Sequence, residues 1–228
     1  MKRALSSLVG LWPSSKLKNR ALNMLGHKIS MSASIAPILI AGHTKLQVED
    51  FARVGPLNAF RSVPRVFLGR NSEIGQLNWV SAAPFLIDTN ASSAAGSFHL
   101  GEHSSFTSRH YVDASGGVAI GDFVTVAGVR SVFMSHGIDV ADNVLDIAPI
   151  IVGDYAMVGG GCNLVMGAVV PAYSVVAMGS VVIKGLERTH ALYAGAPAKF
   201  KKVVAAGAYA SRRHGAVPPR NSSTNVVQ

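Results

Sequence analysis

The chain has 228 residues, of which 49% are hydrophobic and only 14% are charged, which is typical of a single domain with a large apolar interior. The formal net charge is +9, but the basic excess lies in residues 2–28 and 184–220 and lacks the interleaved aromatic residues of a surface that binds nucleic acid. A single cysteine, Cys162, excludes a disulfide within the chain.

Residues 1–28 form a basic amphipathic segment that we expect to cap the rest of the chain. The apolar stretch 4–12 imitates a secretion signal, but it is short and ends at Pro13, so we expect no signal peptide. From 14 to 25, apolar residues recur at helical spacing beside three basic ones, which predicts a helix ending at Gly26. Two roles remain open for this helix: covering an open end of the fold, or contacting an anionic membrane or a lipid-linked substrate.

An aliphatic residue occupies every sixth position in the second half of the chain: Val152, Val158, Leu164, Val170, Val176 and Val182. The position four residues after each of the first five is small: Ala156, Cys162, Ala168, Ser174 and Ser180. A helix has a period of 3.6 and a strand a period of 2, whereas a chain coiled into flat sides needs one inward side chain per side. The pattern predicts an all-β solenoid of hexapeptide repeats over 29–186, with Cys162 as a packing residue.

The same phase recurs upstream in three shorter runs. These are Leu68, Ile74, Val80 and Leu86; Leu100, Phe106 and Val112; and Ile120, Val126 and Val132. The offsets between runs are not multiples of six, so we expect inserted loops at about 87–99 and 137–151 and a two-residue slip near Gly116. Functional residues are expected at these interruptions, because each coil of a solenoid otherwise serves only to stack on its neighbours.

Two histidines break the rule of small residues. Counted from Val132, His136 falls in the small position directly before the second insertion, and His110 does so when counted from Phe106; Asn78 and Arg130 are milder exceptions. A lone histidine is more often structural, but a large ionisable side chain at the point where a loop begins makes His136 a candidate for catalysis.

Three segments carry a family resemblance: 134–139 (MSHGID), 178–184 (MGSVVIK) and 194–199 (AGAPAK). Together with the repeat they resemble the hexapeptide-repeat acyltransferases, and within them the maltose and galactoside acetyltransferases and the polysaccharide O-acetyltransferases. The resemblance implies a left-handed parallel β-helix that forms a homotrimer and binds acyl-CoA in a groove between subunits.

This resemblance implies an acetyl-CoA-dependent O-acetyltransferase that modifies a sugar hydroxyl in surface polysaccharide or glycan biosynthesis, in the cytoplasm or at the inner face of the membrane. His136 would be the general base. Asp113, Asp139 and Glu102 are candidates for orienting its ring, since the correct ring nitrogen must be presented. We expect His110, Asp113 and Asp139 to lie at the carbohydrate acceptor.

The donor contacts implied by the family's motif are Gly160, Met178, Ile183, Lys184, Lys199 and Lys202, with 187–204 as a segment that contacts CoA. The lysines would meet phosphates as point charges, and Gly160 would allow close backbone approach. Ile183 stands where the family often has threonine, so a hydroxyl contact is lost there. Residues 205–228 have no periodicity and are expected to form a mobile tail.

Two other functions remain open. The same solenoid occurs in carbonic anhydrase-like enzymes that hold zinc with three histidines across a subunit interface, and this chain has His99, His103, His110 and His136 near the insertions. A structural scaffold without catalytic activity is the second. We expect no metal, because zinc binding would leave the segments around Lys184 and 195–199 without a purpose. We also expect no nucleic acid as partner.

Overall fold

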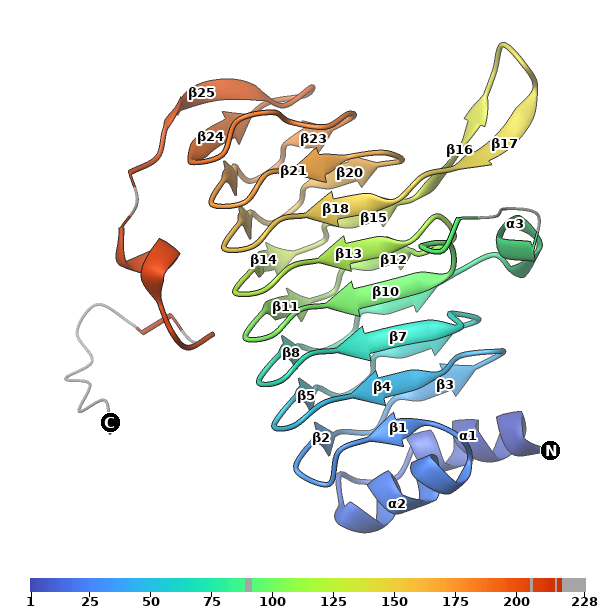
Figure 1. Cartoon of the computed structure of the whole chain (residues 1–228). Coiled ribbons are helices and arrows are strands. Elements are labelled where there is room, and N and C mark those ends of the chain that lie inside the picture. Colours follow the sequence, from blue (N-terminus) through green and yellow to red (C-terminus); the bar gives the residue numbers. More distant parts are fainter. Residues whose placement is uncertain (89–91, 206, 216, 219–228) are drawn as a thin grey trace.

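The computed structural model describes residues 1–88, 92–205, 207–215 and 217–218. Its body is a three-sided parallel β-helix, in which successive strands join three sheets in turn (Figure 1). We name these sheets A, B and C. Neighbouring strands are in parallel register, for example Val118 with Ile150 in sheet A and Asp113 with Met134 in sheet C.

The strands are short, and each sheet collects one from every coil. Sheet A contains β1 (Lys28–Ile29), β4 (Leu46–Val48), β7 (Arg65–Leu68), β10 (Ser97–Leu100), β13 (Val118–Ile120), β18 (Ile150–Val152) and β21 (Val169–Val170). Sheet B contains β2 (Ser34–Ile35), β5 (Arg53–Val54), β8 (Glu73–Ile74), β11 (Ser105–Ser108), β14 (Thr125–Val129), β19 (Met157–Val158), β22 (Val175–Val176), β24 (Ala191–Ala194) and β25 (Lys199–Val203). Sheet C contains β3 (Leu39–Ala41), β6 (Ala59–Arg61), β9 (Trp79–Ser81), β12 (Tyr111–Asp113), β15 (Val132–Met134), β20 (Asn163–Val165) and β23 (Val181–Val182).

The core is one apolar column enclosed by the three sheets. The six aliphatic residues of the strict repeat, from Val152 to Val182, are at most 1% exposed, which confirms their predicted inward direction. The column also extends below the predicted runs, because Ile29, Ile35 and Val54 are buried in the first coils. Each such side chain stabilises the fold by about 1.5–3 kcal/mol when it leaves water.

The phase of the repeat differs from the prediction at β15. Phe133, rather than Val132, is fully buried, because β14 contains an extra residue and the register shifts so that Ser108 pairs with Val129. Gly128, at φ 71°, lies within this bulge. The small position is therefore occupied by buried Ser131 and not by Arg130, and His136 does not lie in a small position of the repeat.

The two insertions have their own structure, and their bounds differ from those expected: the first lies about three residues earlier in the chain, and the second ends before Ile150. The first contains α3 (Pro84–Asp88), so Leu86 lies in this helix and not in a coil, and residues 97–99 belong to β10. The second is a hairpin of β16 (His136–Asp139) and β17 (Val144–Ile147), and β18 resumes the solenoid at Ile150. This hairpin, which we call the arm, projects from the body (Figure 1).

Two helices cover the lower end of the solenoid in Figure 1, where the sequence predicted one: α1 (Lys2–Gly10) and α2 (Lys16–Met24). Ser15 caps α2 by accepting a hydrogen bond from the Lys18 N–H. Lys18 is fully buried, and its Nζ donates to the carbonyls of Gly10, Trp12 and Ala36 at 2.8–2.9 Å. Among the described helices, none is long and apolar enough to cross a membrane.

The end of the chain departs from the expected mobile tail. After β25, residues 207–215 return along the corner between sheets A and B and include a 3₁₀ helix, Ala208–Ser211. The Arg212 guanidinium lies 3.9 Å from the centroid of the Tyr209 ring and donates to the Phe123 carbonyl. Residues 206, 216 and 219–228, which the same prediction covered, lie outside the described residues.

Candidate active site

His136 and Asp113 form a hydrogen-bonded pair at the edge where the strands of sheet C end. We call this the carboxyl edge of sheet C. β12 ends at Asp113 and pairs with β15, and His136 follows β15 at the first residue of the arm. The Nδ1 atom of His136 lies 2.8 Å from Oδ2 of Asp113. Adjacent coils therefore bring together two residues that are 23 positions apart in the sequence.

Two serines fix the carboxylate in place. The Ser115 hydroxyl donates to Oδ1 of Asp113 at 2.6 Å, and the Ser135 hydroxyl lies 2.7 Å from the Asp113 backbone carbonyl and 3.0 Å from Oδ2. Ser135 also accepts a hydrogen bond from the Gly116 N–H at 2.8 Å. Asp113 is only 5% exposed, so these donors replace the water that a carboxylate would otherwise bind.

The pair leaves one ring nitrogen of His136 for chemistry. Because Nδ1 faces the carboxylate, it carries the proton, and Nε2 is the nitrogen with a free lone pair. The His136 side chain is 34% exposed, whereas that of Asp113 is 7% exposed. The arrangement can take a proton from a hydroxyl group at Nε2 and hold the resulting positive charge beside a carboxylate.

The other predicted acceptor residues lie elsewhere. His110 is 2% exposed, its Nδ1 accepts the Ser131 N–H and its Nε2 lies 3.0 Å from the Thr107 hydroxyl. Burial lowers the pKa of His110 to about 4, so it is a neutral packing residue that offers an acceptor little surface. Asp113 is likewise shielded, and its position fits ring orientation rather than acceptor contact.

The remaining candidates for orienting His136 do not reach it. Asp139 is exposed in the arm, and its side chain accepts the backbone N–H groups of Ala141 and Asp142. Glu102 follows β10, at the corner between sheets A and B, where its backbone N–H donates to Asp122. Of the three carboxylates proposed from the sequence, Asp113 is the one that contacts the ring.

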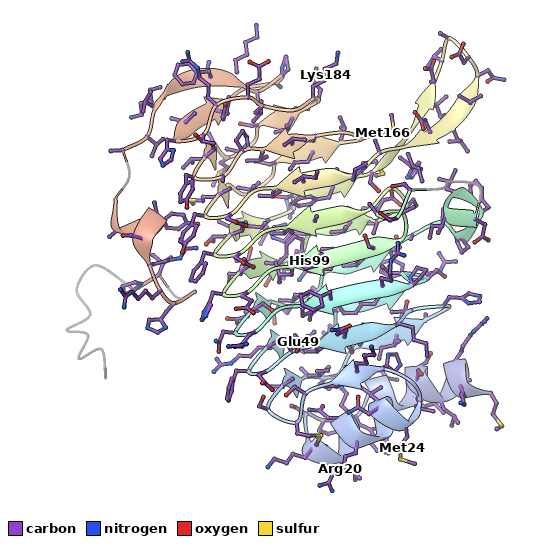
Figure 2. All side chains as sticks on the ribbon, in the orientation of Figure 1. Arg20, Met24, Glu49, His99, Met166 and Lys184 are labelled. Carbon is purple, nitrogen blue, oxygen red and sulfur yellow. The ribbon has the colours of Figure 1, made fainter. Side chains whose placement is uncertain are left out.

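Two predicted donor-binding residues share the carboxyl edge with His136. Ile183 and Lys184 follow β23, which lies two strands above β15 in sheet C. This offset corresponds to roughly 10 Å along the stack. Met166, at the end of the intervening β20, lies between them, and Figure 2 shows Met166 and Lys184 in the upper coils. Ile183 is 50% exposed, so this edge combines an apolar surface with a cation.

Two other predicted donor-binding residues, Gly160 and Met178, lie at the opposite edge of sheet C, where its strands begin. The Gly179 N–H, next to exposed Met178, donates to the Gly160 carbonyl at 3.0 Å, so these turns stack directly. Lys199 and Lys202 lie on β25, which pairs with β24 above the last coil. The six predicted donor-binding residues all lie in the upper coils, but a single chain does not bring them together into one site.

The four histidines considered for zinc do not converge within the described part of the chain. His99 stacks on Phe67 on sheet A, His103 stacks on Phe123 at a corner, and buried His110 is separated from His136 at the carboxyl edge. No group of three His, Cys, Asp or Glu residues among the described positions is placed to hold a metal.

Sequence reasoning missed the serines that hold Asp113. Ser115 lies two residues after Asp113 and Ser135 directly before His136, but short polar residues are frequent in loops and carried no separate signal. Their role depends on stacking, because Ser135 comes from the coil above Asp113.

No protein-family model and no curated protein sequence matches the chain. Among solved structures, a hexapeptide transferase family protein from Anaplasma phagocytophilum aligns with 72% of this chain and 82% of its own, at 21% identity and a TM-score of 0.51. A Bacillus cereus protein assigned to the acetyltransferases aligns with 79% of this chain and 88% of its own, at 15% identity and a TM-score of 0.55. These likenesses show that the fold is the left-handed parallel β-helix expected from the sequence.

Proposed function

We propose that this protein is an acyl-CoA-dependent O-acyltransferase that transfers an acetyl group to a sugar hydroxyl, with His136 as general base. The observation that carries the proposal is the 2.8 Å contact between His136 Nδ1 and Asp113 Oδ2, at the edge of a β-helix whose solved likenesses include transferases. The segment resemblance around 134–139 supports the same assignment independently of the geometry.

The chemistry follows from the free Nε2 atom. A sugar hydroxyl is a weak nucleophile, so His136 takes its proton as the oxygen attacks the carbonyl carbon of the thioester. The carbon–sulfur bond then breaks, and the proton returns from His136 to the departing thiolate. Asp113 keeps the ring in the required tautomer and stabilises the imidazolium between these steps. General-base assistance of this kind accelerates a reaction roughly 10²- to 10⁴-fold.

Acetyl-CoA fits the groups available near the upper coils. Exposed Met178 and Ile183 can contact the pantetheine arm, and Lys184, Lys199 and Lys202 can neutralise phosphates. These residues lie at both edges of sheet C and on β25 of sheet B, so one ligand contacts all of them only when neighbouring copies face each other. This requirement supports the homotrimer, with the donor in the groove between subunits.

The acceptor site is proposed to lie beside the arm. His136 begins β16, the first strand of the arm, so an acceptor hydroxyl at Nε2 lies at the base of the arm. We favour a carbohydrate of a surface polysaccharide or its precursor, modified in the cytoplasm or at the inner face of the membrane. Asp139 is the acceptor contact retained from the sequence, and His110 is not.

The test combines donor binding with turnover. Acetyl-CoA binding is measured by calorimetry, and free CoA thiol released from acetyl-CoA is assayed with a panel of sugars and oligosaccharides. His136→Ala should lower the rate at least about 100-fold while changing acetyl-CoA affinity less than threefold. Asp113→Asn should also lower the rate strongly, because it favours the wrong tautomer, and it should shift the pH–rate profile.

The control is His43→Ala, which removes an exposed histidine near the opposite end of the chain and should leave the rate unchanged. Full activity of His136→Ala would exclude this mechanism. Absence of acetyl-CoA binding together with about one zinc per chain in the same preparation would favour the metalloenzyme instead.

A further inference from the structure

The lower end of the solenoid carries most of the positive charge of the protein. Residues 1–48 contain seven lysines and arginines and no acidic residue, and the first acidic residue is Glu49. Lys18 is buried, and the other six cations are exposed: Lys2, Arg3, Lys16, Arg20, Lys28 and Lys45. This end is therefore a cationic surface, whereas basic and acidic residues nearly balance over the rest of the chain.

Exposed apolar side chains lie among these cations on both helices. Met1, Leu5, Leu8 and Trp12 are spaced by four, three and four residues, so they form one stripe along α1 and its end. On α2, Leu17 and Met24 are 65% and 84% exposed, with exposed Arg20 between them. Figure 2 shows Arg20 and Met24 directed away from the solenoid at its lower end.

The exposed apolar side chains of α1 cannot be buried by rotating the helix toward the solenoid. The opposite side of the helix is already packed, because Val9 and Gly10 are buried and a Cβ at Gly10 would lie 2.8 Å from the Ile38 carbonyl. The Ser7 hydroxyl also donates to the Ile40 carbonyl at 2.5 Å. The direction of the exposed stripe is thus fixed by contacts with β3.

α2 is anchored just as firmly. Nζ of Lys18 donates to three carbonyls, and Nδ2 of Asn19 donates to the carbonyls of Ser30 and Ala33 at 2.9–3.0 Å. Burial lowers the pKa of Lys18 to about 8, which shows that the ammonium group has lost hydration. Its three hydrogen bonds to carbonyls compensate for this loss and hold α2 against the solenoid. The outer faces of α1 and α2 together form a permanent surface, which we call the cap face.

We propose that the cap face docks on an anionic phospholipid membrane. A membrane surface accepts apolar side chains at the headgroup boundary and attracts cations beside them, which matches the two components of the cap face. Nucleic acid would leave the apolar stripe without a partner. A second copy of the chain docked through the same face would bring the four exposed cations of α1 and α2 against four others, and no acidic residue of 1–48 could compensate them.

Docking in this way would orient the enzyme. The carboxyl edge at β15 lies four strands above β3 in sheet C, roughly 19 Å along the stack. The candidate active site would therefore face a headgroup-linked glycan that extends from the membrane, instead of the bilayer itself. This consequence rests on the proposed function, but the docking surface does not.

The test is flotation of the full-length protein with vesicles of phosphatidylcholine alone or with 30% phosphatidylglycerol. Binding should require the anionic lipid and weaken as salt is raised. Lys16→Glu/Arg20→Glu should lower the fraction bound at least about tenfold, since each cation near an anionic surface contributes about fivefold in affinity. The matched control, Arg53→Glu/Arg70→Glu, makes the same charge change at exposed positions on the sides of the solenoid and should bind almost as well as the wild type.

Trp12 reports the apolar contact directly. In a Trp79→Phe background it is the one tryptophan of the chain, and its emission should shift to shorter wavelength on anionic vesicles. Leu8→Ser/Met24→Ser should lower the fraction bound without changing the wild-type mass in solution. Equal binding to both vesicle types, equal loss in the control pair, or an unshifted Trp12 emission would each overturn the proposal, as would a fall in oligomer mass for the serine variant.

Discussion

Histidine has two different environments in this protein. His136 is half-buried beside a carboxylate, with one ring nitrogen directed to Asp113. His27 and His110 are buried, and in both the Nδ1 atom accepts a backbone N–H from the next coil. Desolvation lowers the pKa of both buried rings to about 4, so they are neutral near pH 7.

The buried histidines predict a loss of stability in acid. An unfolded histidine binds a proton near pH 6.5, whereas His110 in the folded chain does so only near pH 4, so stability falls as the pH decreases from about 6.5 to 4. Between pH 7.5 and pH 5, His110 should contribute about 1–2 kcal/mol to this loss. His110→Gln should unfold at a lower urea concentration at pH 7.5 and show a smaller further decrease at pH 5.

The exposed His43→Gln is the matched control for this measurement and should keep the wild-type pH dependence. An unchanged pH dependence in His110→Gln would mean that His110 binds its proton at the same pH in the folded and unfolded chains, which contradicts the prediction. The sequence alone identified both His110 and His136 as exceptions to the repeat, but it could not separate their roles. Their roles differ because His110 faces the interior of the coil and His136 does not. A single extra residue in β14 shifts the phase of the repeat in the coil that leads to His136.

At the scale of elements, one corner of the solenoid is built from stacked rings. His103, Phe123, Tyr155, Tyr173 and His190 follow one another along the corner between sheets A and B, with centroids 4.7–5.2 Å apart. All five have positive φ between 51° and 60°, a conformation that costs roughly 1–2 kcal/mol for a residue with a side chain. Stacking at the spacing of the coils offsets this cost.

Residues 207–215 use this column as their docking surface. The Arg212 guanidinium lies 3.9–5.8 Å from the rings of Tyr209, Tyr155 and Phe123, and the Tyr209 hydroxyl donates to the Ala156 carbonyl. The sequence predicted a mobile tail here because these residues lack periodicity. The partners of this segment in the solenoid, such as Tyr155 and Ala156, are more than fifty residues away in the chain. No local pattern in the sequence could therefore reveal these contacts.

Arg212→Ala should release this segment without unfolding the solenoid. Loss of the cation–π and hydrogen-bond contacts should increase amide hydrogen exchange at 207–215 at least about tenfold, because local opening then requires less free energy. The urea midpoint of the whole protein should change little. Arg213→Ala alters the neighbouring exposed arginine and should exchange like the wild type. Equal protection in both variants would show that Arg212 does not hold the segment.

At the scale of the whole molecule, the cap face, the Asp113–His136 pair and the predicted donor contacts are separated along the solenoid axis. The cap face lies at the lower end, the Asp113–His136 pair lies in the middle coils, and the predicted donor contacts lie in the upper coils (Figure 1). The six-residue period was sufficient to predict this stacked architecture, because each coil needs only an inward aliphatic residue on each side. It could not predict the arm, which has an antiparallel register unrelated to the repeat.

The arm predicts where copies of the chain meet. Ile138 and Leu145 lie opposite each other in the hairpin and are 67% and 49% exposed, and Val140 is 86% exposed. An apolar projection of this kind is typical of a contact with another subunit. In the proposed homotrimer it would pack against the neighbouring copy, close to where the donor contacts of two chains must meet.

Ile138→Ser/Leu145→Ser should therefore weaken assembly. The wild type is expected to have about three times the 23.8 kDa mass of one chain by light scattering, and the double variant should show a smaller mass at micromolar concentration. Its acetyl-CoA affinity should fall with the mass, since the two groups of donor contacts lie at opposite edges of one chain. Phe51→Ser removes a side chain of similar exposure, 60%, from a distant corner and should leave both mass and affinity unchanged. A double variant that keeps the wild-type mass would place the subunit contact away from the arm, and one that loses mass but keeps affinity would place the donor site within a single chain.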